Sequence, residues 1–149
     1  MNKITVIGTG SVGSTIAYTL TIMGLASEIV MIDVNNEKAL GEALDIRQGT
    51  PFCGPCEVYA GDYRDAEGSD IVIVSSGIAR KEGQTRLELA QTNVNIMKII
   101  APEITKYAPN AVYIIVSNPV DILTYTFNKV SGIPEARIIG SGTVLDTSR

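Results

Sequence analysis

The chain has 149 residues, of which 45% are hydrophobic and 19% charged, and its net charge is −4. This length and composition are typical of one folded globular domain, and the negative charge gives no reason to expect a nucleic acid or a membrane surface as partner. No apolar run approaches the roughly 18 residues of a membrane span, and a strand expected from the third residue leaves no room for a signal peptide. We therefore expect a cytoplasmic protein.

A glycine-rich turn follows the first expected strand. Residues 3–8 are mostly apolar and β-branched, as in a buried parallel strand, and residues 8–13 have the pattern G-x-G-x-x-G. A helix is expected directly after the turn, and this context predicts a dinucleotide-binding site. Gly8 permits the tight turn, Gly10 lets the backbone approach a pyrophosphate, and Gly13 lets helix and strand pack closely.

The second expected strand ends in an acidic residue. Residues 28–33 are mostly apolar and end in Asp33, which follows Gly13 by 20 residues. A carboxylate at this place accepts hydrogen bonds from the adenosine ribose hydroxyls. Asp33 would also repel the 2′-phosphate of NADP, and no arginine follows it directly, so NAD is the expected cofactor. The alternative is an ordinary αβ unit with a solvated acid at a strand end.

Helices and strands are expected to alternate along the whole chain. This alternation predicts an α/β fold with a doubly wound, six-stranded parallel sheet, a Rossmann dinucleotide-binding domain with strand order 3-2-1-4-5-6. The expected helices span residues 14–24, 37–48, 87–107, 122–130 and, as an opening helix, 143–149; the other four strands span residues 58–60, 70–75, 111–117 and 137–140. The apolar residues that mark the first two helices are Ile16, Ala17, Leu20, Met23, Ala39, Leu40, Ala43, Leu44 and Ile46.

The two cysteines form the motif Cys-Gly-Pro-Cys at residues 53–56, as in thioredoxin-type redox pairs. Such a pair needs a helix after it to lower the thiol pKa, whereas residues 57–60 are typical of a strand. A zinc site cannot be completed within the chain, which has no histidine and no third cysteine. We therefore expect a surface loop and no metal, with a regulatory disulfide or a redox protein as the alternatives.

Four stretches together resemble one enzyme family. They are VIGTGSVG at 6–13, GQTRL at 83–87, VSNPVD at 116–121 and GSGTVLD at 140–146. The chain resembles the amino-terminal half of the NAD-dependent L-lactate/malate dehydrogenases. The resemblance implies an NAD-binding Rossmann domain over residues 1–149 that ends just inside the start of the catalytic domain, with the second domain absent. It also implies a small 2-keto or 2-hydroxy acid as substrate and a homo-oligomer for the full-length protein.

The resemblance implies roles for particular residues. Arg86 would polarise the substrate carbonyl when a loop closes, and Asp146 would orient the catalytic imidazole. Asn118 would hydrogen-bond the substrate oxygen and the nicotinamide side of the cofactor, and Arg149 would grip the substrate carboxylate. The cofactor contacts implied by position are Gly8, Gly10, Val12, Gly13, Asp33, Lys38, Tyr63, Gly77, Ile78, Val116, Asn118 and Ser141. From the residues alone, Lys38 equally fits a solvated helix face, Tyr63 a packed turn and Arg86 a surface position.

The family's general acid/base histidine lies beyond Arg149, and this chain contains no histidine. Reduction of a keto acid needs a proton donor that titrates near neutral pH. We therefore expect these 149 residues to bind the cofactor without turnover. A stand-alone nucleotide-binding module is the competing interpretation.

Arg80 lies where the family selects its substrate. Members that resemble lactate dehydrogenases usually have glutamine there, and members that resemble malate dehydrogenases have arginine, which pairs with the second carboxylate of oxaloacetate. Arg80 therefore favours malate, whereas residues 85–89 and 140–143 favour L-lactate. We expect L-lactate dehydrogenase, with malate dehydrogenase as the alternative. An Arg80 side chain that faces solvent beside Lys81 would reconcile the two signals.

Overall fold

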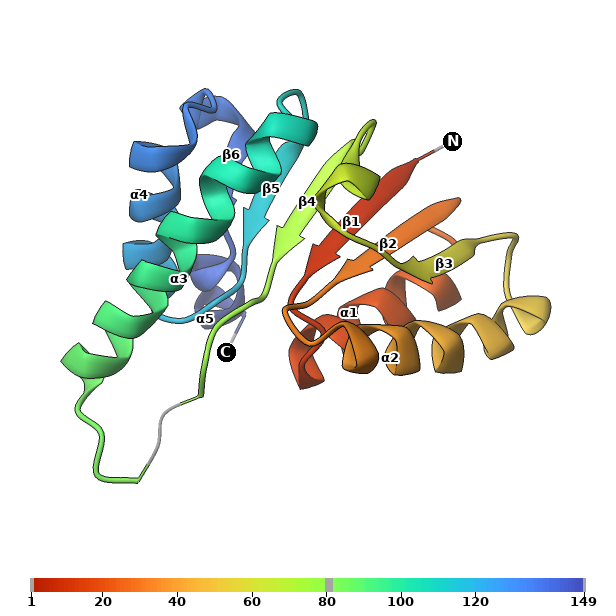
Figure 1. The fold of residues 1–149 in the computed structure, drawn as a ribbon, viewed down its shortest axis with the longest axis horizontal. Helices are drawn as coiled ribbons and strands as arrows, with labels where there is room; N and C mark the ends of the chain where they lie inside the picture. Colours follow the sequence, from red (N-terminus) through yellow and green to blue (C-terminus); the bar gives the residue numbers. More distant parts are fainter. Residues whose placement is uncertain (1, 80–81, 149) are drawn as a thin grey trace.

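One parallel sheet organises the fold (Figure 1). The computed structural model describes residues 2–79 and 82–148. Neighbouring strands are all parallel and follow the order β3-β2-β1-β4-β5-β6, so the predicted fold class and strand order are confirmed. The strands are β1 (Lys3–Ile7), β2 (Glu28–Ile32), β3 (Glu57–Ala60), β4 (Ile71–Val74), β5 (Val112–Ile115) and β6 (Ile138–Gly140).

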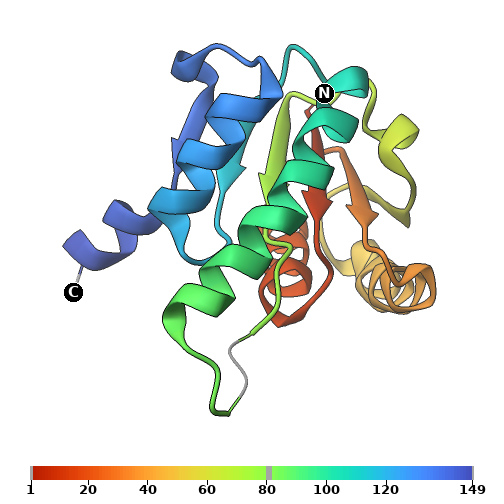
Figure 2. The same ribbon diagram turned by 60° about the vertical axis from the view of Figure 1, so that its left-hand side comes forward.

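Two long helices cover each face of this sheet, each pair beside different strands. α1 and α2 lie against one face beside β1 to β3, whereas α3 and α4 lie together against the opposite face beside β4 to β6 (Figures 1 and 2). The α-helices are α1 (Ser11–Ile22), α2 (Asn36–Gly49), α3 (Arg86–Tyr107), α4 (Val120–Ser131) and α5 (Gly142–Thr147), and the short 3-10 helices are η1 (Thr50–Phe52), η2 (Tyr63–Ala66) and η3 (Glu135–Arg137). None of the described helices combines the length and the apolar character needed to cross a membrane.

Each central strand supplies side chains to two hydrophobic cores, one on each face of the sheet. Successive strand residues point to opposite faces, and β1 accordingly places Val6 in the core under α1 and α2 and Ile7 in the core under α3 and α4. Strands buried on both faces read as continuous apolar runs. This is why β1, β2 and β4 could be predicted from the sequence.

Several details of the first two helices differ from the prediction. α1 begins at Ser11 rather than at residue 14, so that Gly13 lies inside its first turn. The helix ends at Ile22 because the chain turns at Gly24, which has a φ of 62°. Met23 is 62% exposed, and Leu40 and Leu44 of α2 are also exposed. The helical spacing predicts the direction of the packed face but not its width, and these three apolar residues lie outside the packed face.

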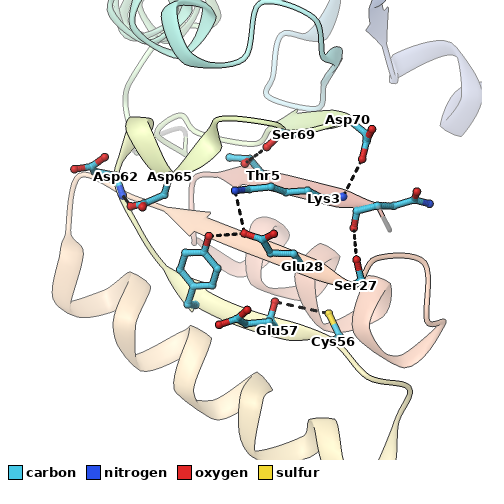
Figure 3. Close-up of polar contacts among 12 residues, drawn as sticks. Lys3, Thr5, Ser27, Glu28, Cys56, Glu57, Asp62, Asp65, Ser69 and Asp70 are labelled. Atoms are coloured by element: carbon cyan, nitrogen blue, oxygen red, sulfur yellow. Dashed lines mark hydrogen bonds and ion pairs between the residues drawn. The ribbon is translucent and has the colours of Figure 1, made fainter.

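A chain of polar contacts joins the beginnings of β1 and β2 to a tyrosine of β3 (Figure 3). Lys3 Nζ lies 2.9 Å from Glu28 Oε1, and the Tyr59 hydroxyl donates to the same oxygen at 2.6 Å. The hydrogen bond from Tyr59, together with the charge of Lys3, lowers the pKa of Glu28 despite its partial burial. The Lys3 backbone N–H also donates to Asp70 next to β4, at 2.9 Å. These contacts fix the ends of the strands that point away from the site described next.

Candidate nucleotide-binding site

A cleft of about 610 Å³ opens at the carboxyl ends of β1, β2 and β4. The chain leaves β1 toward β2 and β3 and then returns to place β4 on the other side of β1, so the strand order reverses at this point. In open α/β sheets such a reversal is where ligands bind. The predicted cofactor residues that line the cleft are Gly8, Gly10, Asp33, Lys38, Tyr63, Gly77 and Ile78.

The fold requires a glycine at two of the three glycine positions of the turn, and the third differs. Gly8 has a φ of 94°, and a Cβ there would lie 2.6 Å from the backbone nitrogen of Ser76. A Cβ on Gly13 would overlap the carbonyl oxygen of Gly8. Gly10 differs, because a Cβ there would meet nothing within 4 Å. The fold therefore requires Gly8 and Gly13, whereas Gly10 faces open space at the cleft, where a pyrophosphate would approach the backbone.

The amino-terminal end of α1 begins at this open glycine. Gly10 is the N-cap residue, and among the described residues no side chain forms a capping hydrogen bond to α1. By contrast, the side chain of Asn35 accepts from the backbone N–H of Lys38 and caps α2. The first N–H groups of α1 therefore remain available to an anion, whose charge the helix dipole also favours.

Asp33 is held at the cleft as a fixed, ionised acceptor. Its Oδ2 accepts from the backbone N–H of Thr9 at 2.7 Å and from the Thr9 hydroxyl at 3.1 Å, and its Oδ1 accepts from the N–H of Asn35 at 2.9 Å. Burial acts to raise the pKa of Asp33, but these hydrogen bonds and the charge of Lys38 outweigh it, so the pKa lies below its ordinary value. Asp33 is a residue that the sequence predicts for the site, and the structure places it at the cleft; Thr9, which orients it, was not predicted.

The opposite wall of the cleft is apolar and was not predicted. Ile96, Ile99 and Ile100 of α3 line it together with Val34, which follows β2. Ile99 is 69% exposed although it belongs to a helix packed on the sheet. An apolar wall with a few polar groups is typical of small-molecule sites, and here it suits a flat aromatic base. The sequence did contain a signal for this wall, because α3 has more apolar positions than its contact with the core needs.

Ser76 adds a polar group that the fold leaves unused. It lines the cleft, and its buried Oγ has no hydrogen-bond partner among the described residues. Buried polar groups are seldom left unpaired. A hydrogen-bonding ligand in the cleft would satisfy this hydroxyl, so the residues present fit a dinucleotide.

Other predicted cofactor residues do not line the cleft. Val12 is exposed in the first turn of α1, and Gly13 is buried beneath it. Val116, Asn118 and Ser141 follow the carboxyl ends of β5 and β6, next to the cleft along the same edge of the sheet.

The predicted substrate residues are only partly described. Arg86 is the first residue of α3, and its side chain is exposed. It follows the N-cap Thr85, which forms a reciprocal capping box with Glu88. Arg80 and Arg149 lie outside the described residues, and so does the side chain of Asp146 in α5. Of the predicted substrate residues, the part of the chain that the structure describes therefore locates the side chains of Arg86 and Asn118.

A strand–glycine turn–helix unit with an acid at the end of the second strand defines a Rossmann domain that binds a dinucleotide. The model of one family, the lactate/malate dehydrogenase NAD-binding domain, matches residues 2–140. The chain belongs to this family. The resemblance inferred from the sequence and the prediction of NAD as cofactor are thereby confirmed at the level of the family.

The proteins similar to this chain include both lactate dehydrogenases and a malate dehydrogenase. L-lactate dehydrogenase 1 of Clostridium acetobutylicum is 60% identical over 147 residues, which are 99% of this chain and 47% of that protein. The structure of minor L-lactate dehydrogenase from Enterococcus mundtii in a ligand-bound form superposes with a TM-score of 0.94 at 42% identity, over 97% of this chain and 46% of the other. The structure of apo malate dehydrogenase from Picrophilus torridus superposes with a TM-score of 0.92 at 40% identity, over 97% of this chain and 47% of the other. The chain spans about half the length of the curated relatives it matches.

The cysteine motif lies away from the cleft. Cys53 and Cys56 are free and half-buried, and β3 begins directly after them at Glu57, as the sequence predicted. Burial raises the pKa of the Cys56 thiol, and the thiol donates a weak hydrogen bond to the carbonyl of Glu57 at 3.9 Å (Figure 3). A raised pKa leaves less of the reactive thiolate at neutral pH.

Replacing Cys53 and Cys56 together with serine is expected to leave NADH affinity unchanged, because neither thiol lines the cleft. Isothermal calorimetry of the double variant and the parent checks this expectation. A thiol titration of the parent should show no strongly acidic thiol. An acidic thiol, or a change in NADH affinity that depends on reductant, would support the redox interpretation instead.

Proposed function

We propose that this domain serves an NAD-dependent L-lactate dehydrogenase, in which pyruvate and NADH give L-lactate and NAD. The observation that carries the cofactor half of the proposal is the fixed, ionised Asp33 at the end of β2, opposite the open Gly10. The lactate half is supported by the stretches at residues 85–89 and 140–143 and by the names of the similar proteins. A glycolytic role, a cytoplasmic location and a homo-oligomeric full-length enzyme are part of the same proposal.

The residues of the cleft would each hold one part of the cofactor. The first turn of α1, beginning at Gly10, would bind the pyrophosphate, and Asp33 would accept hydrogen bonds from the adenosine ribose. The isoleucines of α3 would pack on the adenine ring, with Tyr63 and Lys38 at the margin. When bound, NADH supplies the hydride for the reduction.

The substrate side of the proposal follows from the resemblance. Arg86 would polarise the carbonyl of the keto acid, since its guanidinium is charged at every working pH. Asn118 would hydrogen-bond the reacting oxygen, and Arg149 would pair with the substrate carboxylate through two parallel hydrogen bonds. Asp146 would orient an imidazole that these 149 residues do not themselves contain.

Calorimetry of the 149-residue chain with NADH and NADPH tests the cofactor assignment. We expect NADH to bind about tenfold more tightly or better, because Asp33 would repel the 2′-phosphate. The same preparation should show no turnover of pyruvate or oxaloacetate, since it contains no histidine to donate the proton. Equal affinity for the two cofactors would contradict the NAD assignment, and turnover by the pure chain would contradict the proposed catalytic roles.

Malate dehydrogenase is the second candidate, favoured by Arg80 and by the likeness to the Picrophilus torridus enzyme. In a full-length enzyme carrying these residues, we expect pyruvate to have the higher kcat/KM and Arg80→Gln to lower only the turnover of oxaloacetate. If Arg80 instead faced the substrate, bound pyruvate would leave the positive charge of the Arg80 guanidinium unpaired. A parent preference of about a hundredfold for oxaloacetate, about 2.7 kcal/mol, that is lost in Arg80→Gln would establish malate as the substrate.

A further inference from the structure

A buried side chain of α3 joins the two loops that follow β4 and β5. Asn93 lies two turns from the start of α3 and is only 3% exposed. Its Oδ1 accepts from the backbone N–H of Ile78 at 2.9 Å, and its Nδ2 donates to the carbonyl oxygens of Ile78 at 3.3 Å and Asn118 at 2.8 Å. One amide group therefore bridges a helix and two strand ends that are far apart in the sequence.

The partners of Asn93 leave no alternative orientation for its amide. The oxygen faces an N–H donor, and the NH₂ group faces two carbonyl acceptors, so turning the amide by 180° would set like groups against each other. The Asn93 side chain also lies tightly against Gly77, where a Cβ would come within 3.3 Å of Asn93 Oδ1. Asn93 thus fixes the spacing of the two loops and the backbone conformation at residues 77–78.

These two loops lie on one side of the reversal point of the sheet. Asp33 follows β2 and would hold the adenosine ribose, and the first turn of α1, next to β1, would hold the pyrophosphate. The rest of a dinucleotide would then extend over the ends of β4 and β5. Ile78 and Asn118 follow these two strands. We propose that Asn93 is a positioning residue for the nicotinamide half of the cofactor and not for its adenosine half.

The inference rests on the proposed function, and a comparison of NADH with ADP isolates it. ADP contains the adenosine and two phosphates but no nicotinamide riboside. Asn93→Asp keeps the shape of the side chain but sets a carboxylate oxygen against the carbonyls of Ile78 and Asn118. We expect this variant to bind NADH about tenfold more weakly, and to bind ADP within about twofold of the parent.

Asn95→Asp is the matched control, because Asn95 is exposed on the same helix and accepts from Gln91 through an oxygen that aspartate retains. It should bind both nucleotides as the parent does. Equal losses of NADH and ADP affinity in Asn93→Asp would show that Asn93 has a general structural role, and this would overturn the inference. An unchanged affinity for both nucleotides would overturn it as well. A parent that binds neither nucleotide would instead contradict the proposed function, and this inference with it.

A measurement on the unchanged protein covers the case in which Asn93→Asp does not fold. The side-chain amide resonances of Asn93 in a two-dimensional ¹⁵N spectrum should shift when NADH is added and stay in place when ADP is added. Shifts of equal size with both nucleotides, or with neither, would overturn the inference.

Discussion

Replacing Gly10 with alanine is expected to leave the fold intact and to remove most of the affinity for NADH. A Cβ at this position meets nothing within 4 Å, and the backbone of Gly10, with a φ of −69°, suits alanine. The only expected loss of stability is that of a poorer N-cap, up to about 1 kcal/mol. With cofactor bound, the same methyl group would occupy the space of the pyrophosphate. Overpacking of this kind costs about 1–3 kcal/mol, which corresponds to an affinity about 5- to 150-fold weaker.

Gly13→Ala is the matched variant in the same turn, and its expected result is the opposite. The new Cβ would overlap the carbonyl oxygen of Gly8 and come within 2.6 Å of Ser75 Oγ, so α1 could not pack on β1. We expect loss of the cooperative unfolding transition in circular dichroism. Calorimetry with NADH completes the comparison. A folded Gly10→Ala variant with full NADH affinity would show that no phosphate approaches this glycine, and a stable Gly13→Ala variant would contradict the packing.

Replacing Asp33 with asparagine is expected to weaken NADH binding about ten- to hundredfold and to narrow the preference over NADPH. Hydrogen bonds to a charged acceptor contribute about 1.5–3 kcal/mol, and the repulsion of a 2′-phosphate disappears with the charge. Asp45→Asn removes the same charge from the exposed surface of α2 and is the control. Calorimetry with both cofactors measures the effect. An unchanged ratio of NADH to NADPH affinity in Asp33→Asn would show that Asp33 does not select the cofactor.

The lowered pKa of Asp33 determines the pH dependence of binding. Because the folded-state pKa lies below the ordinary value, the carboxylate is already ionised throughout the neutral and mildly acidic range. Its contribution to stability is fully present above the unfolded-state pKa and is lost as the pH falls through the folded-state pKa. We expect NAD affinity to stay constant between about pH 5 and pH 8. A decline with an apparent pKa in that range would point to a different group.

The fold could be predicted from the sequence because the evidence for it is local. Continuous apolar runs mark strands buried on both faces, and the alternation of such runs with helical spacing leaves few topologies. Asp33 could be predicted for the same reason, since it lies a fixed distance after the glycine turn. The buried faces of the helices are less well indicated by the sequence. Leu40, for example, continues the apolar pattern of α2 but is exposed, outside the face that packs on the sheet.

The rest of the site depends on contacts that only folding creates. Thr9 meets Asp33 across 24 residues, and Asn93 meets Asn118 across 25. A threonine inside a glycine turn and an asparagine inside a helix carry no local sign of either partner. The roles assigned to Arg80, Asp146 and Arg149 come from the resemblance and stay predictions.

The shared strands have a thermodynamic consequence for the whole chain. Val6 and Ile7 are adjacent in β1 but belong to cores on opposite faces, and Ile73 and Val74 do the same in β4. If one layer of helices left the sheet, it would expose strands whose other face packs against the second layer. Melting should therefore be a single calorimetric event in which the enthalpy measured directly equals the enthalpy obtained from the slope of the transition. A nucleotide that binds only at the cleft would then raise the melting temperature of α4 as much as that of α1.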